Sequence, residues 1–293
     1  MRDGRIRRKV IACLLALLIF GSMRVAGQDA TGVPRPFSAG EKLLFRIEWN
    51  PPWFLFFLPV MEAGEVEVQL VRELQYQGRK AIEIRFKAHS SGTFVNLVGI
   101  KVDDESVYIS DAATFCTMEA TEKIREGQRK RDINVIYLQD SNRLHIREVD
   151  LGVIPNKIRK DEYKEGIPKC VKDVFSALLS IRLRDFSLGM VEKTQVGNAD
   201  RVKEVQSVVE KKEVVSTPMG RYESWRLNTV ALLGSLFREG GQFRIWLTAD
   251  ERRLPVQFEA KVRLGKVTGK LKTANLPAPP EIRSREEEKI RNP

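Results

Sequence analysis

Apolar and polar residues alternate along most of the chain with a period of two. In the first clear example, Phe45, Ile47 and Trp49 are separated by Arg46 and Glu48. This period places one row of side chains on a buried face and the other in water, as in a strand of a half-buried sheet. Such segments lie at 43–49, 66–70, 82–88, 106–109, 133–137, 144–146, 191–196, 205–209, 213–216, 224–230 and 242–271. The pattern predicts an antiparallel meander.

The stretch 242–271 shows the alternation most clearly. Apolar residues from Phe243 to Leu247 alternate with polar or amphipathic neighbours, and a second series runs from Val256 to Leu264. The polar connector 248–255 between the two series predicts a hairpin with a long loop.

Two segments have helical instead of strand spacing. The apolar residues at positions i, i+3, i+4, i+7 and i+8 of the longer segment are Val171, Val174, Phe175, Leu178 and Leu179. This stripe predicts an amphipathic helix over 170–183 that packs on a sheet. Phe94, Leu97 and Val98 predict a minor helix near 94–101. The expected fold class is mainly β, a single curved antiparallel sheet or open barrel that wraps one amphipathic helix.

The first 27 residues differ in composition from the rest. A basic head precedes an unbroken apolar run from Val10 to Phe20, and small residues follow at 25–27. This order is typical of a secretory signal peptide, and the run is shorter than the ~20 residues that cross a bilayer as a helix. We expect export with cleavage near Gln28, in preference to a retained anchor.

The remaining chain divides by composition into three parts. Residues 28–39 form a leader punctuated by proline and glycine, and 40–275 carry the strand and helix patterns of a single β-rich domain. Residues 276–293 are rich in proline and then in charge, which predicts a disordered tail.

Nearly half of the net positive charge lies in the export signal. The whole chain has a formal net charge of +11, and removing residues 1–27 leaves 44 basic and 38 acidic groups, a net charge of +6. These charges interleave along the strands, as on solvated faces. We expect no nucleic-acid partner, while a mild attraction to anionic lipid headgroups remains compatible with the charge.

Two cysteines, Cys116 and Cys170, remain in the exported chain. An oxidising compartment permits a disulfide between them, but their spacing is equally compatible with two buried free thiols.

The segment from Trp53 to Met61 is the least polar connector in the molecule. It contains no charged residue, and its one side chain that can form a hydrogen bond is the indole of Trp53. Such a segment requires a cover, from its own protein, a partner, a lipid or a membrane surface. We consider two interpretations: a strand extension folded into the core, or a ligand-binding lip formed by Trp53, Phe54, Phe56 and Phe57, with Phe94, Leu97 and Val98 nearby.

The sequence carries no recognisable catalytic or cofactor motif. His89 and His145, its two histidines, lie in different segments and form no catalytic motif in sequence. Spacings typical of zinc, phosphate or dinucleotide sites are absent, and Asp103–Asp104–Glu105 lacks the alternating ligands of a calcium loop. We expect no enzyme, no metal and no cofactor.

Several segments together resemble an exported bacterial family, domain of unknown function 3108. They are GEKLLFRIEW (40–49), AGEVEVQL (63–70), VKDVFSALLSIRLRDF (171–186), STPMGRYESWRL (216–227) and IWLTADERRLPVQFEAKVRLGKVTGKL (245–271). The resemblance implies a periplasmic or envelope location and an architecture similar to the half-barrels of periplasmic lipoprotein carriers, which hold acyl chains. It supplies no catalytic residue. The longer apolar connector 50–61 departs from the family pattern.

These observations lead to one main hypothesis and two alternatives. The main hypothesis is a non-enzymatic envelope protein that binds a lipid, a lipoprotein acyl chain or a hydrophobic protein segment in an apolar concavity, with contact to the outer or inner membrane surface. The first alternative is an envelope scaffold or protein-interaction module with a filled core. The second is a glycan-active enzyme that uses paired carboxylates. The oligomeric state is not predicted.

Overall fold

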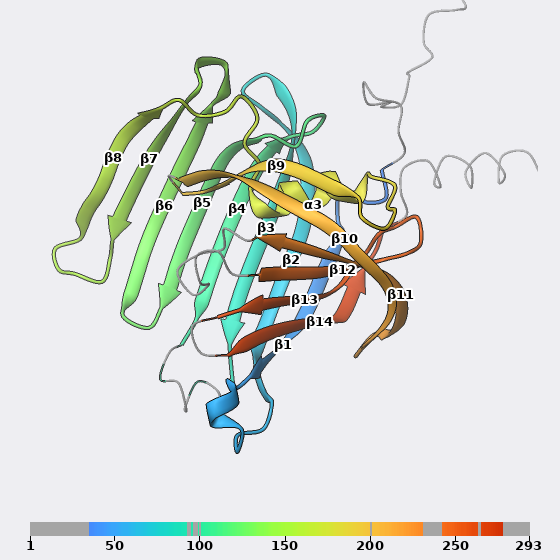
Figure 1. Ribbon diagram of the computed structural model, residues 1–293. Helices are drawn as coiled ribbons and strands as arrows, with labels where there is room; N and C mark the ends of the chain where they lie inside the picture. Colours follow the sequence, from blue (N-terminus) through green and yellow to red (C-terminus); the bar gives the residue numbers. More distant parts are fainter. Residues whose placement is uncertain are drawn as a thin grey trace, which may run out of the picture. The chain divides into compact units, whose positions relative to one another are not determined.

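The fold is one large antiparallel sheet that carries helix α3, seen in a computed structural model that describes residues 35–92, 95, 99, 101–199, 201–230, 242–262 and 265–277 (Figure 1). The strands are β1 (Lys42–Asn50), β2 (Met61–Tyr76), β3 (Arg79–Ser90), β4 (Asp103–Asp111), β5 (Thr117–Glu126), β6 (Arg129–Leu138), β7 (Arg143–Asp150), β8 (Lys157–Glu165), β9 (Val191–Asn198), β10 (Arg201–Thr217), β11 (Gly220–Val230), β12 (Gln242–Thr248), β13 (Pro255–Lys261) and β14 (Lys266–Asn275). The helix is α3 (Val174–Arg182), and two short 3-10 turns are η1 (Trp53–Leu55) and η2 (Gln139–Ser141).

The sheet consists of two meanders that share a central pair of strands. Its order is β8-β7-β6-β5-β4-β3-β2-β1-β14-β13-β12-β11-β10-β9, so β1 pairs with both β2 and β14. Each following strand pairs with its sequence neighbour, and the sheet ends at β8 on one side and at β9 on the other. The expected open, curved antiparallel sheet is therefore confirmed.

Helix α3 lies in the chain between the two edge strands and packs on both wings of the sheet. Leu179 belongs to a buried cluster with residues of β2 to β7. Ile181 belongs to a second cluster with Val209, Leu227 and Leu247, from β10, β11 and β12. Figure 1 shows α3 enclosed between the two wings. We call the sheet face that carries α3 the inner face.

The two faces of the sheet differ as the sequence alternation predicts. Inner-face residues such as Leu43 and Phe45 are buried. The outer face carries ion pairs between neighbouring strands, each worth no more than about 1 kcal/mol at such exposure. Examples are Lys42–Glu67, Lys270–Glu48, Lys266–Glu259, Arg226–Glu210 and Arg72–Glu83.

The alternation missed β5 and β8, and it did not predict β14 as a separate strand. Nearly every residue of β8 is exposed, and seven of its nine residues in KIRKDEYKE are charged. Because β8 is an edge strand, its charges hinder pairing with another chain, and no apolar row is needed. In β5 the inner row includes Glu122 between Ala120 and Ile124, which interrupts the apolar pattern.

The predicted boundaries of two other elements were wrong. The helix begins at Val174, not at residue 170, because Asp173 caps it and Lys172 instead forms a parallel bridge with Val196 of β9. The strand predicted to run from Val256 to Leu264 ends at Lys261, and β14 starts at Lys266.

The minor helix predicted near 94–101 falls largely outside the described residues, as do Phe94, Leu97 and Val98. The tail from residue 278 and the first 34 residues also fall outside them.

No helix in the described ranges combines the length and the apolar composition required to cross a bilayer.

Candidate functional site

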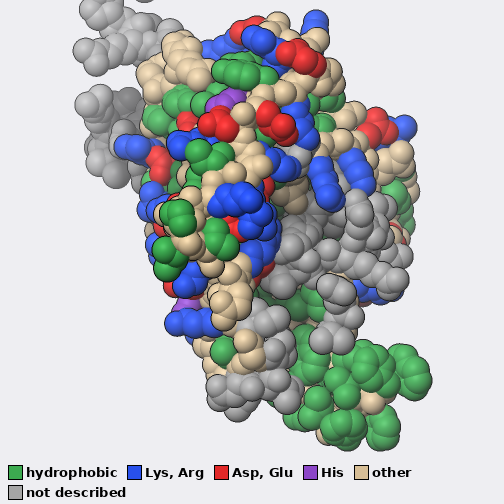
Figure 2. All heavy atoms as spheres, turned by 90° about the vertical axis from the view of Figure 1, so that its left-hand side faces the viewer, with side chains coloured by type: hydrophobic (Ala, Val, Ile, Leu, Met, Phe, Trp, Pro, Cys, Tyr) green, Lys and Arg blue, Asp and Glu red, His purple; other side chains and the backbone are tan. Residues whose placement is uncertain are grey.

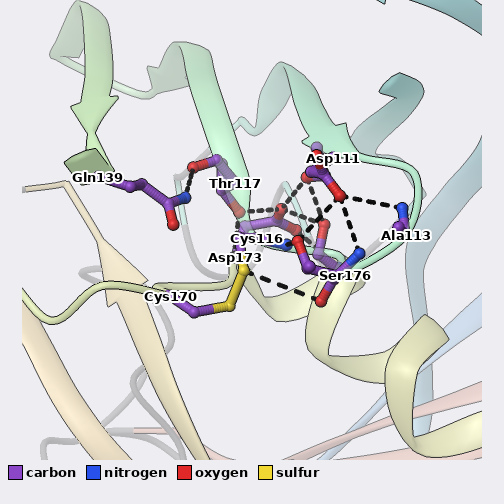
Figure 3. Close-up of a disulfide and its surroundings, with 10 residues drawn as sticks. Asp111, Ala113, Cys116, Thr117, Gln139, Cys170, Asp173 and Ser176 are labelled. Atoms are coloured by element: carbon purple, nitrogen blue, oxygen red, sulfur yellow. Dashed lines mark hydrogen bonds between the residues drawn. A yellow bond between two sulfur atoms is a disulfide. The ribbon is translucent and has the colours of Figure 1, made fainter. Parts of the chain in front are cut away.

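The start of α3 is fixed by a buried network centred on Asp173. One carboxylate oxygen accepts the backbone N–H groups of Phe175, at 2.8 Å, and Ser176, at 2.9 Å, which is the bonding of an N-cap. The other oxygen accepts the hydroxyls of Thr117, at 2.8 Å, and Ser176, at 2.5 Å. Figure 3 shows these side chains pointing toward one another from β5 and α3. The network therefore holds the helix against the sheet.

A disulfide lies directly beside this network. Cys116 and Cys170 are bonded, with their Cα atoms 5.1 Å apart and a sequence separation of 54 (Figure 3). The backbone N–H of Thr117 also donates to the carbonyl of Val171 at 2.8 Å. The bond therefore ties the start of β5 to the segment that leads into α3.

The end of α3 is fixed by Arg182, whose side chain is 1% exposed. Its guanidinium donates to both carboxylate oxygens of the buried Glu41, at 2.5 and 3.1 Å, and to the carbonyl of Arg252 at 3.2 Å. It also lies 5.0 Å from the ring centre of Phe37. Contacts with the segment before β1 and with the β12–β13 loop thus hold the helix at its second end.

The inner face is less completely filled toward the end of the strands at which the β1–β2 loop lies. Phe86 pairs with Val68, and its ring lies 5.1 Å from that of Phe175 in α3, so this row belongs to the inner face. Buried residues dominate the inner face around α3, whereas several apolar side chains are only half-buried, mostly in the strand halves that lead to the β1–β2 loop. These are Val66, Val68, Phe86, Ala88, Ile124, Phe243, Phe258 and Val267. We call this set the inner strip.

One carboxyl group lies on the inner face beside this strip. Glu122 of β5 is half-buried and accepts a hydrogen bond from the Tyr108 hydroxyl at 3.3 Å. Burial raises the pKa of Glu122, and the negative charge of Asp173 raises it further, although the Tyr108 bond opposes the shift. Burial also raises the pKa of Tyr108 and of Tyr137. The pair Glu122–Tyr108 can therefore exchange hydrogen bonds with a polar group at the edge of an otherwise apolar surface.

We expect Glu122→Gln to stabilise the protein at pH 7. A carboxyl whose folded-state pKa is raised binds more protons folded than unfolded, so its contribution to stability falls as pH rises through the interval between the two values. Urea unfolding of both proteins across pH measures the effect. The stability gap should close below about pH 4, where the unfolded carboxyl is also protonated. A variant that is less stable than the wild type at pH 7 contradicts this assignment.

The loop between β1 and β2 presents large apolar side chains to water. Trp53 is 86% exposed, Phe54 52%, Phe56 85%, Phe57 67% and Val60 56%. The interpretation of this segment as a core strand extension is therefore wrong. The prolines around it disfavour a regular strand, and the chain forms the turn η1 instead. The interpretation of Trp53, Phe54, Phe56 and Phe57 as a ligand-binding lip stays a prediction.

The histidines and the acidic run have separate partners. His89 lies 3.6 Å from Asp103, and His145 lies 2.8 Å from Asp161. Glu105 lies between Lys87 and Lys123. His89, Asp103, Glu105 and the two lysines border a shallow depression of about 350 Å³ with charged walls. Within the described segments, no three His, Cys, Asp or Glu side chains gather as metal ligands would.

The fold and the site define a class of protein: an open, curved antiparallel sheet that encloses one disulfide-anchored helix. The family model "Protein of unknown function (DUF3108)" matches residues 44–272. The chain belongs to this family, as its sequence segments indicated.

Solved structures share the architecture at low sequence identity. A β-barrel-like protein of domain of unknown function DUF1849 from Brucella abortus is 10% identical, with a TM-score of 0.52, over 83% of this chain and 99% of that one. This likeness shows a common fold. A protein described as a putative exported protein, with a YmcC-like fold, from Bacteroides fragilis is 9% identical over the same shares, with a TM-score of 0.33. No curated protein matches the chain.

Proposed function

We propose that this protein is a non-enzymatic, exported envelope protein that binds a lipid acyl chain on the inner strip. The observation that carries the proposal is the half-buried apolar surface next to α3. A soluble protein gains free energy by covering such a surface, at roughly 25 cal/mol per Å² of apolar area removed from water.

The anchoring of α3 supports a surface that exists before the ligand arrives. The Asp173 network and the disulfide hold the start of the helix, and Arg182 holds its end. Because the helix does not have to be reordered, binding would cost less conformational entropy. The carboxyl of Glu122 and the hydroxyl of Tyr108 would meet a polar end of the ligand.

Export is supported by two features of the chain. Residues 1–27 have the basic head and apolar run of a signal peptide. Cys116 and Cys170 form a disulfide, and disulfides form and persist mainly in oxidising compartments. The thiol state of the protein in its own cells, taken up in the Discussion, tests this placement.

Binding of cis-parinaric acid, a fluorescent fatty acid, tests the acyl-chain site. We expect Val66→Asp to weaken binding by about tenfold or more, because the new carboxylate would be covered by the acyl chain. The matched control is Gln69→Asp, which puts the same charge on the outer face of the same strand, where Gln69 pairs with Lys42.

Thermal melting establishes that both variants are folded at the temperature of the titration. Equal loss of affinity in the two variants, or no binding by the wild type, would overturn the proposal. Equal affinity of the wild type and Gln69→Asp for the probe, together with a lower affinity of Val66→Asp, would support it.

A further inference from the structure

The most exposed apolar group of side chains in the described chain lies in the loop between β1 and β2, residues 51–60. Figure 2 shows a hydrophobic patch that projects at one end of the molecule, beyond the mixed charged surface. The exposed members of this loop are Trp53, Phe54, Phe56, Phe57 and Val60. We call these five residues the aromatic tip. Exposure on this scale costs free energy in water unless another surface covers it.

The loop is folded in a way that keeps the aromatic tip outside. The side chains of Leu55 and Leu58 turn inward and pack on the cluster that contains Trp49. The backbone N–H of Leu55 donates to the Pro52 carbonyl at 2.8 Å, and that of Leu58 donates to the Leu55 carbonyl at 2.9 Å. Two alternating sets of side chains therefore divide the loop into an anchor and a tip.

The neighbouring β13–β14 turn braces the base of the loop. Gly265 has a φ of +91°, and a Cβ atom there would lie 2.1 Å from the carbonyl oxygen of Asn50. The turn and the loop therefore approach so closely that only glycine fits. This contact holds the start of the loop in position.

The chemistry of the tip fits a lipid bilayer. Residues 51–61 contain no charged side chain, and the Trp53 indole N–H is a polar group of the kind enriched at membrane interfaces, where one end of the ring is apolar and the other wet. A specific protein interface usually surrounds such a centre with polar groups that form hydrogen bonds. The loop itself supplies no such rim.

A second apolar tip lies at the same end of the strands. Because neighbouring strands alternate in direction, the β1–β2 and β7–β8 connections fall at the same end of the sheet. In the β7–β8 connection Val153 is 37% and Ile154 100% exposed. Among the described residues at this end, Lys101, Lys130, Lys157 and Lys261 are exposed lysines, and Glu62 and Asp103 are exposed acids, of which Asp103 faces His89.

We propose that the aromatic tip inserts into the interfacial region of a lipid bilayer that contains anionic lipids. The aromatic rings would enter the boundary between headgroups and acyl chains, and the lysines at this end would lie against the headgroups. The half-buried side chains of the inner strip lie mostly in the strand halves that lead to the same end. The membrane would therefore be next to the proposed acyl-chain site, but the insertion does not depend on that site.

Flotation of the purified protein with vesicles tests the proposal. The probe is a vesicle of equal parts phosphatidylglycerol and phosphatidylethanolamine. We expect the wild type to float with these vesicles, and Phe56→Ser/Phe57→Ser to bind at least about tenfold more weakly, because binding scales with the inserted apolar area. Both side chains face solvent, so the variant should unfold at the wild-type temperature.

The matched control is Leu188→Ser/Met219→Ser. It also removes two exposed apolar side chains, and Met219 lies in the β10–β11 turn at the opposite end of the strands. We expect this control to float like the wild type. Vesicles of phosphatidylcholine alone should retain less of the wild type, since they lack the anionic headgroups that attract the lysines.

Fluorescence identifies the part of the protein that enters the membrane. Emission of the wild type should shift to the blue with vesicles, and Trp53→Phe should lose that shift while still floating. Loss of flotation in the Leu188/Met219 control, unchanged flotation of Phe56→Ser/Phe57→Ser, or no flotation of the wild type would each overturn the proposal. Self-association through the tip, seen in sedimentation without flotation, would also overturn it.

The acyl-chain site and the membrane insertion can be tested independently of each other. Phe56→Ser/Phe57→Ser should keep its affinity for cis-parinaric acid in buffer without vesicles, and Val66→Asp should still float. A loop variant that loses both properties would indicate that the tip is part of the acyl-chain site and would contradict its separate role.

Discussion

Replacing Arg182 with methionine should lower the free energy of unfolding by about 3–5 kcal/mol. The substitution leaves Glu41 buried with a negative charge and no guanidinium opposite it. It also removes the contact with the Arg252 carbonyl, which joins α3 to the β12–β13 loop. Urea unfolding followed by circular dichroism measures the loss.

The double variant Arg182→Met/Glu41→Gln distinguishes the cost of the unpaired Glu41 carboxylate from the cost of the lost packing. Removing the charge should recover much of the stability, because a buried unpaired carboxylate is the main cost. If the single and double variants are equally unstable, the pair does not act through charge. If Arg182→Met is as stable as the wild type, the guanidinium does not hold the helix.

Removing the disulfide should cost about 4 kcal/mol, from the entropy of the 54-residue loop that it closes in the unfolded chain. The variant is Cys116→Ala/Cys170→Ala, and urea unfolding again measures the change. Reduction of the wild type should produce a similar loss, which serves as the control for the substitutions. A wild type whose midpoint is unaffected by reductant contradicts the structural role of the bond.

The same cysteines report on the compartment. Maleimide added as the protein's own cells are lysed should label it only after reduction, because the exported chain retains only Cys116 and Cys170, which are bonded to each other. Immediate labelling of thiols would contradict export with cleavage near Gln28, since Cys13 would still be present or the disulfide absent.

The sheet could be predicted from the sequence because one face of most strands packs on a core. Alternation in β1 and in β12 shows that face directly. β8 could not be found in this way, because both of its faces meet solvent. A strand without a buried face has no apolar period to read.

The contacts that anchor α3 could not be predicted, because they join residues distant in sequence. Arg182 and Glu41 are 141 residues apart, and Thr117 and Asp173 are 56 apart. Either charge alone resembles a solvated surface residue. The spacing of Cys116 and Cys170 likewise gave no indication of their distance in space, and two free thiols were equally compatible with it.

The candidate site was predictable in part. Composition alone marked Trp53, Phe54, Phe56 and Phe57 as residues that need a cover, but it did not show whether they face inward or outward. That direction depends on Leu55 and Leu58, which take the inward positions. Val66, Phe86 and Phe258 were assigned to a buried row, but their half-burial depends on how far α3 extends over the sheet. Glu122 was missed with β5.

The central claim is that an acyl chain lies on the inner strip, and photo-crosslinking tests it most directly. A fatty acid with a diazirine near its methyl end is bound in vesicle-free buffer and irradiated, and mass spectrometry of peptides locates the modified residues. We predict labels on inner-face residues of β2, β3 and β13, among them Val66, Phe86 and Phe258. Labels confined to the outer face, or to the aromatic tip, would contradict the claim.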